Sequence, residues 1–78
     1  MQPLDKQLAE VFSAVFGVDK IDDFISVTTL EEWDSLSHIT LILALEEKFN
    51  ISFSLDEAIE IISVAEIKRV LISKGIQV

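Results

Sequence analysis

Apolar residues recur at helical spacing through most of this chain, and this periodicity constrains its fold more than any other feature. Between residues 4 and 16 this spacing predicts a helix over 3–16. The apolar residues that follow it are Leu4, Leu8, Val11, Phe12, Val15 and Phe16. Pro3 suits the first turn of this helix and Gly17 its end. No alternating strand pattern, internal repeat or low-complexity segment competes with the helical pattern.

A second helix is predicted over 35–49, where Asp34 or Ser35 can cap the first amides and Asn50 can end the helix. The connection over 17–34 has no clear periodicity, yet it contains more apolar residues than a solvated loop needs: Ile21, Phe24, Ile25, Val27 and Leu30. We therefore expect this connection to pack across the helices.

Two pairs of residues with the spacing of a capping box predict the remaining helices. Ser54 and Glu57 open a short third helix. Ser63 and Glu66 open a fourth helix, which has Lys74 in its last turn and Gly75 at its end. The sequence thus predicts an all-α fold, a small four-helix bundle with three main helices and one short one, in a single domain over 1–78.

Composition limits the chemistry that this chain can support. Half of its 78 residues are apolar and 26% are charged, which suits one compact core. The absence of cysteine excludes disulfides and thiolate metal sites, and a single histidine excludes a histidine-rich metal site. Residues 1–8 do not resemble a signal peptide, and no apolar run approaches the roughly 20 residues that span a bilayer. We expect a cytoplasmic protein.

Charge is distributed unevenly along the chain, whose net charge is −8. Residues 21–67 contain eleven acids against Lys48 alone, whereas the rest contains three acids and five bases. Such a field repels nucleic acid and anionic membranes and attracts basic protein surfaces. The alternative, that the acids only keep the protein soluble, does not explain why the bases stand at the two ends.

The predicted helix over 35–49 has two apolar faces, at about 100° of rotation per residue. One face suits burial in the bundle and consists of Leu41, Ile42, Leu45 and Phe49. The other lies almost opposite and consists of Leu36, Ile39 and Leu43. The connection or the third helix could cover this second face, or it could be an exposed strip for docking. Periodicity alone leaves both alternatives open.

A motif joins this helix to a known family. Segment 32–36 is Glu-Trp-Asp-Ser-Leu, and segment 39–49 is Ile-Thr-Leu-Ile-Leu-Ala-Leu-Glu-Glu-Lys-Phe. These segments closely resemble the acyl carrier proteins, in which Asp-Ser-Leu opens the second helix. Leu55-Asp56-Glu57-Ala58, Ile61 and Val64 match the short third helix and the start of the fourth. The resemblance covers nearly the whole chain and implies an acyl-carrier-protein-like bundle.

The resemblance implies a prosthetic group at Ser35. In the family, this serine carries 4′-phosphopantetheine, which a phosphopantetheinyl transferase attaches from coenzyme A with a magnesium ion. Asp34 is then expected to help position that metal. A predicted helix N-terminus also favours a phosphodiester on physical grounds, through free amides and the helix dipole. The simpler alternative is that Ser35 is only a capping residue.

The same resemblance implies a docking surface for partner enzymes. Leu36, Ile39 and Leu43 match positions that contact partners. Arg and Lys residues of acyl-loading and acyl-processing enzymes would recognise an acidic rim of this chain. The rim consists of Glu46, Glu47, Asp56, Glu57 and Glu60. Each of these acids could instead belong to a solvated face. We expect a monomeric carrier that has no turnover of its own.

The chain departs from carriers of primary fatty acid synthesis at the motif. Those usually have glycine where this chain has Glu32, next to Trp33, and acids where it has Ser37 and Thr40. Both departures are expected to alter the surface that synthase enzymes recognise. They favour a specialised carrier for lipid modification, a polyketide, or an aminoacyl or nonribosomal peptide pathway.

Two other function classes remain open at this level. The chain could be an acidic interaction module without a prosthetic group, or a small hydrolase that uses Ser35 and His38. His38 is expected to face the core as a packed, hydrogen-bonded residue with no chemistry, and Trp33 is expected to pack under the connection.

Overall fold

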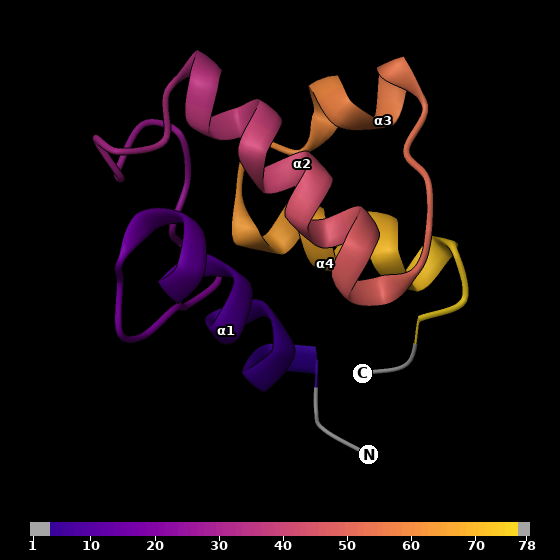
Figure 1. Cartoon of the computed structure of the whole chain (residues 1–78), viewed down its shortest axis with the longest axis horizontal. Helices are drawn as coiled ribbons and strands as arrows, with labels where there is room; N and C mark the ends of the chain where they lie inside the picture. Colours follow the sequence, from indigo (N-terminus) through magenta and orange to yellow (C-terminus); the bar gives the residue numbers. More distant parts are fainter. Residues whose placement is uncertain (1–3, 77–78) are drawn as a thin grey trace.

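The computed structural model describes residues 4–76, which form four helices and no strand, arranged as in Figure 1. The helices are α1 (Leu4–Phe16), α2 (Ser35–Phe49), α3 (Leu55–Glu60) and α4 (Val64–Ser73). α1 packs against α2. The all-α prediction with one short third helix is confirmed. The predicted role of Pro3 lies outside the described residues.

One apolar core joins α1, α2 and α4. Its buried residues are Leu4, Leu8, Val11, Phe12, Trp33, Leu41, Leu45, Ile61, Val64, Ile67, Val70 and Leu71. From α2, Leu41 and Leu45 are fully buried, and Ile42 and Phe49 pack against the core. The predicted core face of α2 is therefore confirmed. Removing these side chains from water supplies the main driving force for folding so short a chain.

The ends of α2 and the start of α3 follow the local signals. The Asp34 carboxylate accepts a hydrogen bond from the Ser37 N–H at 2.9 Å, so Asp34 is the cap. Asn50 ends α2 with φ 55° and ψ 52°, a left-handed conformation that asparagine tolerates. At α3, Ser54 and Glu57 form both hydrogen bonds of the capping box.

The prediction for α4 was correct for its start and wrong in two details. Ser63 Oγ accepts the Glu66 N–H at 3.1 Å, but the Glu66 carboxylate accepts hydrogen bonds from Arg69 instead of returning to the backbone. Lys74 is the C-cap, one residue beyond the last helical turn. Gly75 follows with φ +94°, which ends the helix.

The connection from α1 to α2 is pinned to the junction between α3 and α4. The Val27 N–H donates to the Ile62 carbonyl at 3.0 Å, and the Val64 N–H donates to the Ile25 carbonyl at 2.9 Å. These bonds form an isolated antiparallel bridge between Ser26 and Ser63. They hold the segment that leads to Ser35 against the start of α4.

The apolar residues of this connection divide into two groups. Ile21, Ile25 and Leu30 pack against the core as expected. The expectation was wrong for Phe24 and Val27, whose side chains are exposed, Phe24 to 86%. Phe24 lies in a tight turn in which its N–H is held by the Asp22 carboxylate.

Candidate functional site

Ser35 is the first residue of α2 and directly follows the cap Asp34. Its side chain is exposed, and the hydroxyl has no hydrogen-bond partner within residues 4–76. The amides of the first turn and the helix dipole place a positive field at this position. The hydroxyl is therefore open to an enzyme, and a phosphate group attached to it would be electrostatically favoured.

Asp34 places a carboxylate beside this hydroxyl. The hydrogen bond from the Ser37 backbone lowers the pKa of Asp34 below its ordinary value, so the group is ionised at neutral pH. Asp34 Oδ1 accepts this bond, and the carboxylate as a whole stays exposed. No cluster of three His, Cys, Asp or Glu residues within 4–76 could hold a metal ion.

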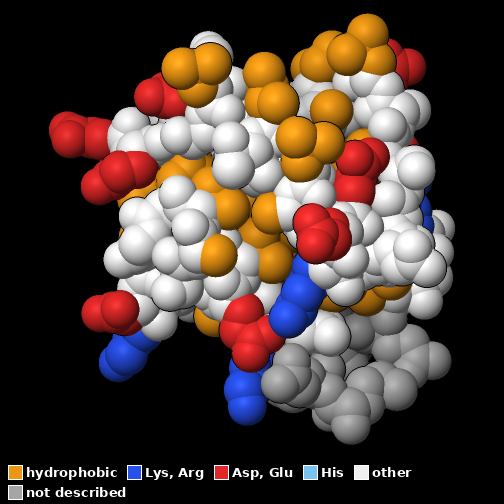
Figure 2. Space-filling view, viewed as in Figure 1, with side chains coloured by type: hydrophobic (Ala, Val, Ile, Leu, Met, Phe, Trp, Pro, Cys, Tyr) orange, Lys and Arg blue, Asp and Glu red, His pale blue; other side chains and the backbone are white. Residues whose placement is uncertain are grey.

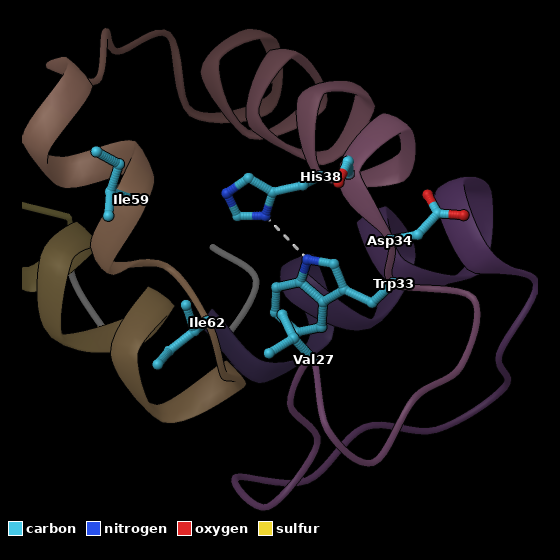
Figure 3. A pocket seen from close by; sticks show the side chains of 7 residues that line it. Val27, Trp33, Asp34, His38, Ile59 and Ile62 are labelled. Carbon is cyan, nitrogen blue, oxygen red and sulfur yellow. Dashed lines mark hydrogen bonds between the residues drawn. The ribbon is translucent and has the colours of Figure 1, made fainter.

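A hollow of about 470 Å³ lies next to Ser35 (Figure 3). Its lining comes from the connection, from the start of α2 and from the α3 region: Val27, Trp33, Asp34, Ser35, His38, Ile59 and Ile62. Most of this lining is apolar. Ser35 is one of the lining residues, so the hollow adjoins its side chain.

Trp33 and His38 form a hydrogen-bonded pair in the wall of this hollow. Trp33 Nε1–H donates to His38 Nδ1 at 2.9 Å, as Figure 3 shows. Because Nδ1 accepts this bond, the ring proton of neutral His38 resides on Nε2, which donates to the Ala58 carbonyl at 2.8 Å. The imidazole thus links the connection, α2 and α3.

Aromatic packing fixes the indole from the other side. Trp33 is only 3% exposed and contacts the rings of Phe12 and Phe16, with centroid distances of 5.6 Å and 5.7 Å. The expected packing roles of Trp33 and His38 are both confirmed. The sequence did not predict their mutual hydrogen bond, because spacing alone does not fix how two residues five apart across the start of a helix lie relative to each other.

The position of His38 also bears on the hydrolase alternative. Each ring nitrogen is engaged, one by Trp33 and one by Ala58. Neither nitrogen is free to take a proton from Ser35 without breaking a bond that holds the fold. The geometry therefore does not support nucleophilic catalysis by this pair.

The second apolar face of α2 is exposed. Leu36 is 78% exposed, Ile39 59% and Leu43 60%, so neither the connection nor α3 covers them. Large apolar side chains that gather on one surface are typical of interaction sites. Exposure excludes the alternative that this face is covered, and its role in docking stays a prediction.

The five acids of the predicted rim differ in how they are held. Glu46 accepts the Phe53 N–H at 2.8 Å. Glu57 accepts the Ser54 N–H and pairs with Lys74 at 2.8 Å, while Glu60 pairs with Arg69 at 3.4 Å. Glu47 and Asp56 have no such partner within residues 4–76.

The fold and the site together define a small helical domain with an exposed serine at the start of its second helix. A model of the family described as "phosphopantetheine attachment site" matches residues 6–71, and the chain belongs to this family of carrier domains. A search of curated proteins found no match.

Family membership identifies the prosthetic group as covalently bound 4′-phosphopantetheine and the chain as a non-catalytic carrier. It also implies interaction with a phosphopantetheinyl transferase and with partner enzymes. The exposed Ser35 hydroxyl and the adjoining hollow fit such a group. No helix in the described part of the chain is long and apolar enough to cross a membrane.

Proposed function

We propose that this protein carries an acyl-type cargo as a thioester on a 4′-phosphopantetheine arm attached to Ser35. The observation that carries the proposal is the exposed, unbonded hydroxyl at the first position of α2. The arm supplies a thiol, which a chain without cysteine lacks. The alternative cargo is an aminoacyl or peptidyl group, held by the same chemistry.

Attachment uses the two residues at the helix start. The Ser35 oxygen bonds to the coenzyme A phosphorus that carries the pantetheine, the P–O bond from this phosphorus to the bridging oxygen of the pyrophosphate breaks, and the nucleotide portion leaves with that oxygen. A base of the transferase takes up the serine proton. The Asp34 carboxylate would help hold the magnesium ion that the transferase brings with coenzyme A, and the ion would offset the charge of the pyrophosphate. The helix dipole then favours the resulting phosphodiester.

We further propose that the pathway is a specialised one rather than primary fatty acid synthesis. The departures lie at Glu32, Ser37 and Thr40; Trp33, the neighbour of Glu32, is buried and is not on a surface that enzymes contact, and Ser37 is half-buried. Glu32 and Thr40 are exposed, and they support the proposal because partners would meet them beside Ser35. Candidate pathways are lipid modification, polyketide assembly and aminoacyl or peptide transfer.

A mass measurement tests the attachment. Incubation with a phosphopantetheinyl transferase, magnesium and coenzyme A should add the mass of one phosphopantetheine to the chain. Ser35→Ala should abolish the gain, whereas Ser37→Ala, two residues further along the same helix, should retain it. Modification that persists in Ser35→Ala would refute the assignment of the attachment residue. No gain with any competent transferase would instead favour an interaction module.

Intact-mass analysis of the protein isolated from its own cell would distinguish the cargo classes. An acyl mass on the arm, released by hydroxylamine, supports the acyl proposal. An amino acid or peptide mass supports the alternative.

A further inference from the structure

Ser35 lies inside a short segment that hydrogen bonds close at three points. We call residues 33–38 the Ser35 turn. The Asp34 carbonyl accepts the His38 N–H at 2.8 Å, and the Asp34 carboxylate accepts the Ser37 N–H at 2.9 Å. The third bond joins the two ends of the turn, since Trp33 Nε1–H donates to His38 Nδ1 at 2.9 Å (Figure 3). An ordinary helix cap supplies the first two bonds, whereas the third is additional.

The Ser35 turn has little around it on its outer side. Asp34, Ser35 and Leu36 are all exposed. The start of α2 stands at the upper edge of the molecule in Figure 1, and Figure 2 shows this edge as an outer surface along which hydrophobic side chains gather. Exposed helix ends fray, because they have few packed contacts. The contacts that hold this turn must therefore act from its inner side.

Both ends of the Trp33–His38 bond are themselves anchored. The indole of Trp33 is 3% exposed and packs against the rings of Phe12 and Phe16 in α1. The imidazole of His38 also bonds to the Ala58 carbonyl of α3 at 2.8 Å. A bond between two anchored side chains requires little further ordering, unlike a pair of free surface side chains. The bond therefore attaches the Ser35 turn to α1 and to α3.

A held turn matters for the chemistry at Ser35. The serine oxygen must lie in line with the phosphorus that it attacks, and a small displacement of a reacting atom lowers the rate strongly. A turn that frays presents the oxygen in several orientations, of which only some are productive. Trp33 and His38 restrict this motion through the backbone of the turn.

We propose that Trp33 and His38 are positioning residues for the modification of Ser35, whose orientation they fix through their mutual hydrogen bond. This inference rests on the proposed carrier function. It gives the pair a role that neither the Asp34 cap nor the helix dipole provides. The two side chains exchange no proton in the step and act only on the geometry of the turn.

The test measures kcat and KM of a phosphopantetheinyl transferase, with coenzyme A and magnesium, for variants of this pair. Trp33→Phe keeps an aromatic ring among its neighbours and removes the N–H donor, so kcat should fall about fivefold. His38→Leu removes both bonds of the imidazole, and kcat should fall about tenfold. KM should change less than about twofold in both variants, because the exposed side chains of α2 are unaltered.

A conservative variant separates the hydrogen bond from the shape of the side chain. His38→Gln has a carbonyl oxygen that can accept from Trp33 and an NH₂ group that can donate to Ala58. It should restore kcat to within about twofold of the wild type. The double variant Trp33→Phe, His38→Leu should have the kcat of His38→Leu alone, because both changes remove the same bond.

A second control distinguishes positioning from general stability. Val70→Ala leaves a cavity in α4, and Val70 is not among the residues that line the hollow at Ser35. Partial unfolding lowers the concentration of competent chain, which raises the apparent KM and leaves kcat unchanged. Val70→Ala should therefore keep the wild-type kcat, although its Tm falls. Circular dichroism measures the Tm of every variant.

Hydrogen exchange of the unmodified chain measures the turn without the transferase. The His38 N–H, which bonds to the Asp34 carbonyl, should exchange about fivefold faster in Trp33→Phe than in the wild type. The Leu45 N–H, near the end of the same helix, should exchange at an unchanged rate. Equal exchange of the His38 N–H in the two proteins would overturn the inference.

The kinetic outcomes separate the inference from the proposed function. If the wild type is not modified, the carrier function fails, and exchange still decides whether the bond holds the turn. If the wild type is modified and Trp33→Phe has the same kcat, the positioning role alone is overturned. The same follows if His38→Gln is as slow as His38→Leu, or if only KM rises. Should His38→Leu unfold, Trp33→Phe with its retained ring carries the test.

Discussion

α3 and α4 follow one another along the chain and open with the same type of signal, yet they differ in what they contribute to the fold. Each has a serine cap whose side chain accepts a backbone N–H. α4 buries Val64, Ile67, Val70 and Leu71, whereas α3 buries none of its residues. α3 is held instead by contacts at its edges: the capping box, the Lys74–Glu57 pair and the bond from His38 to Ala58. Apolar content alone therefore does not determine which helix builds the core.

The largest expected effect comes from truncating one isoleucine in each helix. Ile67→Ala removes a fully buried side chain and should lower the free energy of unfolding by about 2–5 kcal/mol, since a cavity remains. Ile59→Ala removes a mostly exposed side chain and should change it by less than about 0.5 kcal/mol. Denaturant unfolding of both variants measures the difference. Equal losses would contradict the division between a core helix and a surface helix.

A smaller effect is expected at the link that holds α3 to α2. His38→Ala leaves the buried Trp33 N–H without its acceptor and the Ala58 carbonyl without its donor. The cost should be about 1–3 kcal/mol in the free energy of unfolding, with a change in the fluorescence of Trp33. Thr40→Ala, an exposed change on the same helix, is the control. Unchanged fluorescence and stability in His38→Ala would show that the bond does not position α3.

Local signals were sufficient to predict the bounds of α2 and the start of α3. Asp34 begins α2 with a side-chain cap, and Asn50 ends it in a left-handed backbone conformation. Both signals depend only on neighbours in sequence. The two faces of α2 follow from helical geometry in the same way. Family resemblance then directed attention to Ser35, and family membership is now shown by the match over residues 6–71.

Features that depend on distant residues were not predictable. The acids Glu57 and Glu60 meet Lys74 and Arg69 only once α4 folds beside α3. Whether an apolar loop residue such as Phe24 points inward depends on the turn around it, and a helical wheel holds no information on that. The docking role of the acidic residues, and of the α2 strip, stays a prediction.

The smallest expected effect concerns the pH dependence of α3. The hydrogen bond from Lys74, with a further bond from the Ser54 backbone, lowers the pKa of Glu57 below its ordinary value of 4.5. A carboxyl whose pKa is depressed by folding stabilises the folded state when it is ionised. This contribution is present above about pH 4.5 and is lost as the pH falls through the folded value. Glu57→Gln should therefore have a lower Tm than the wild type at neutral pH, and the gap should close as the solution is acidified.

Thermal melts of the two proteins across this range measure the gap. The matched control is Asp56→Asn, which removes the neighbouring carboxylate of the same helix that has no partner within residues 4–76. A Tm gap for Glu57→Gln that stays constant with pH would mean that the Lys74–Glu57 pair does not hold α3 to the end of α4. α3 would then depend on His38 and its own cap, and the contrast with α4, which is held by its buried face, would become sharper. A Tm gap that closes on acidification would show that the Lys74–Glu57 ion pair helps to hold α3 in place. High salt would also weaken this pair.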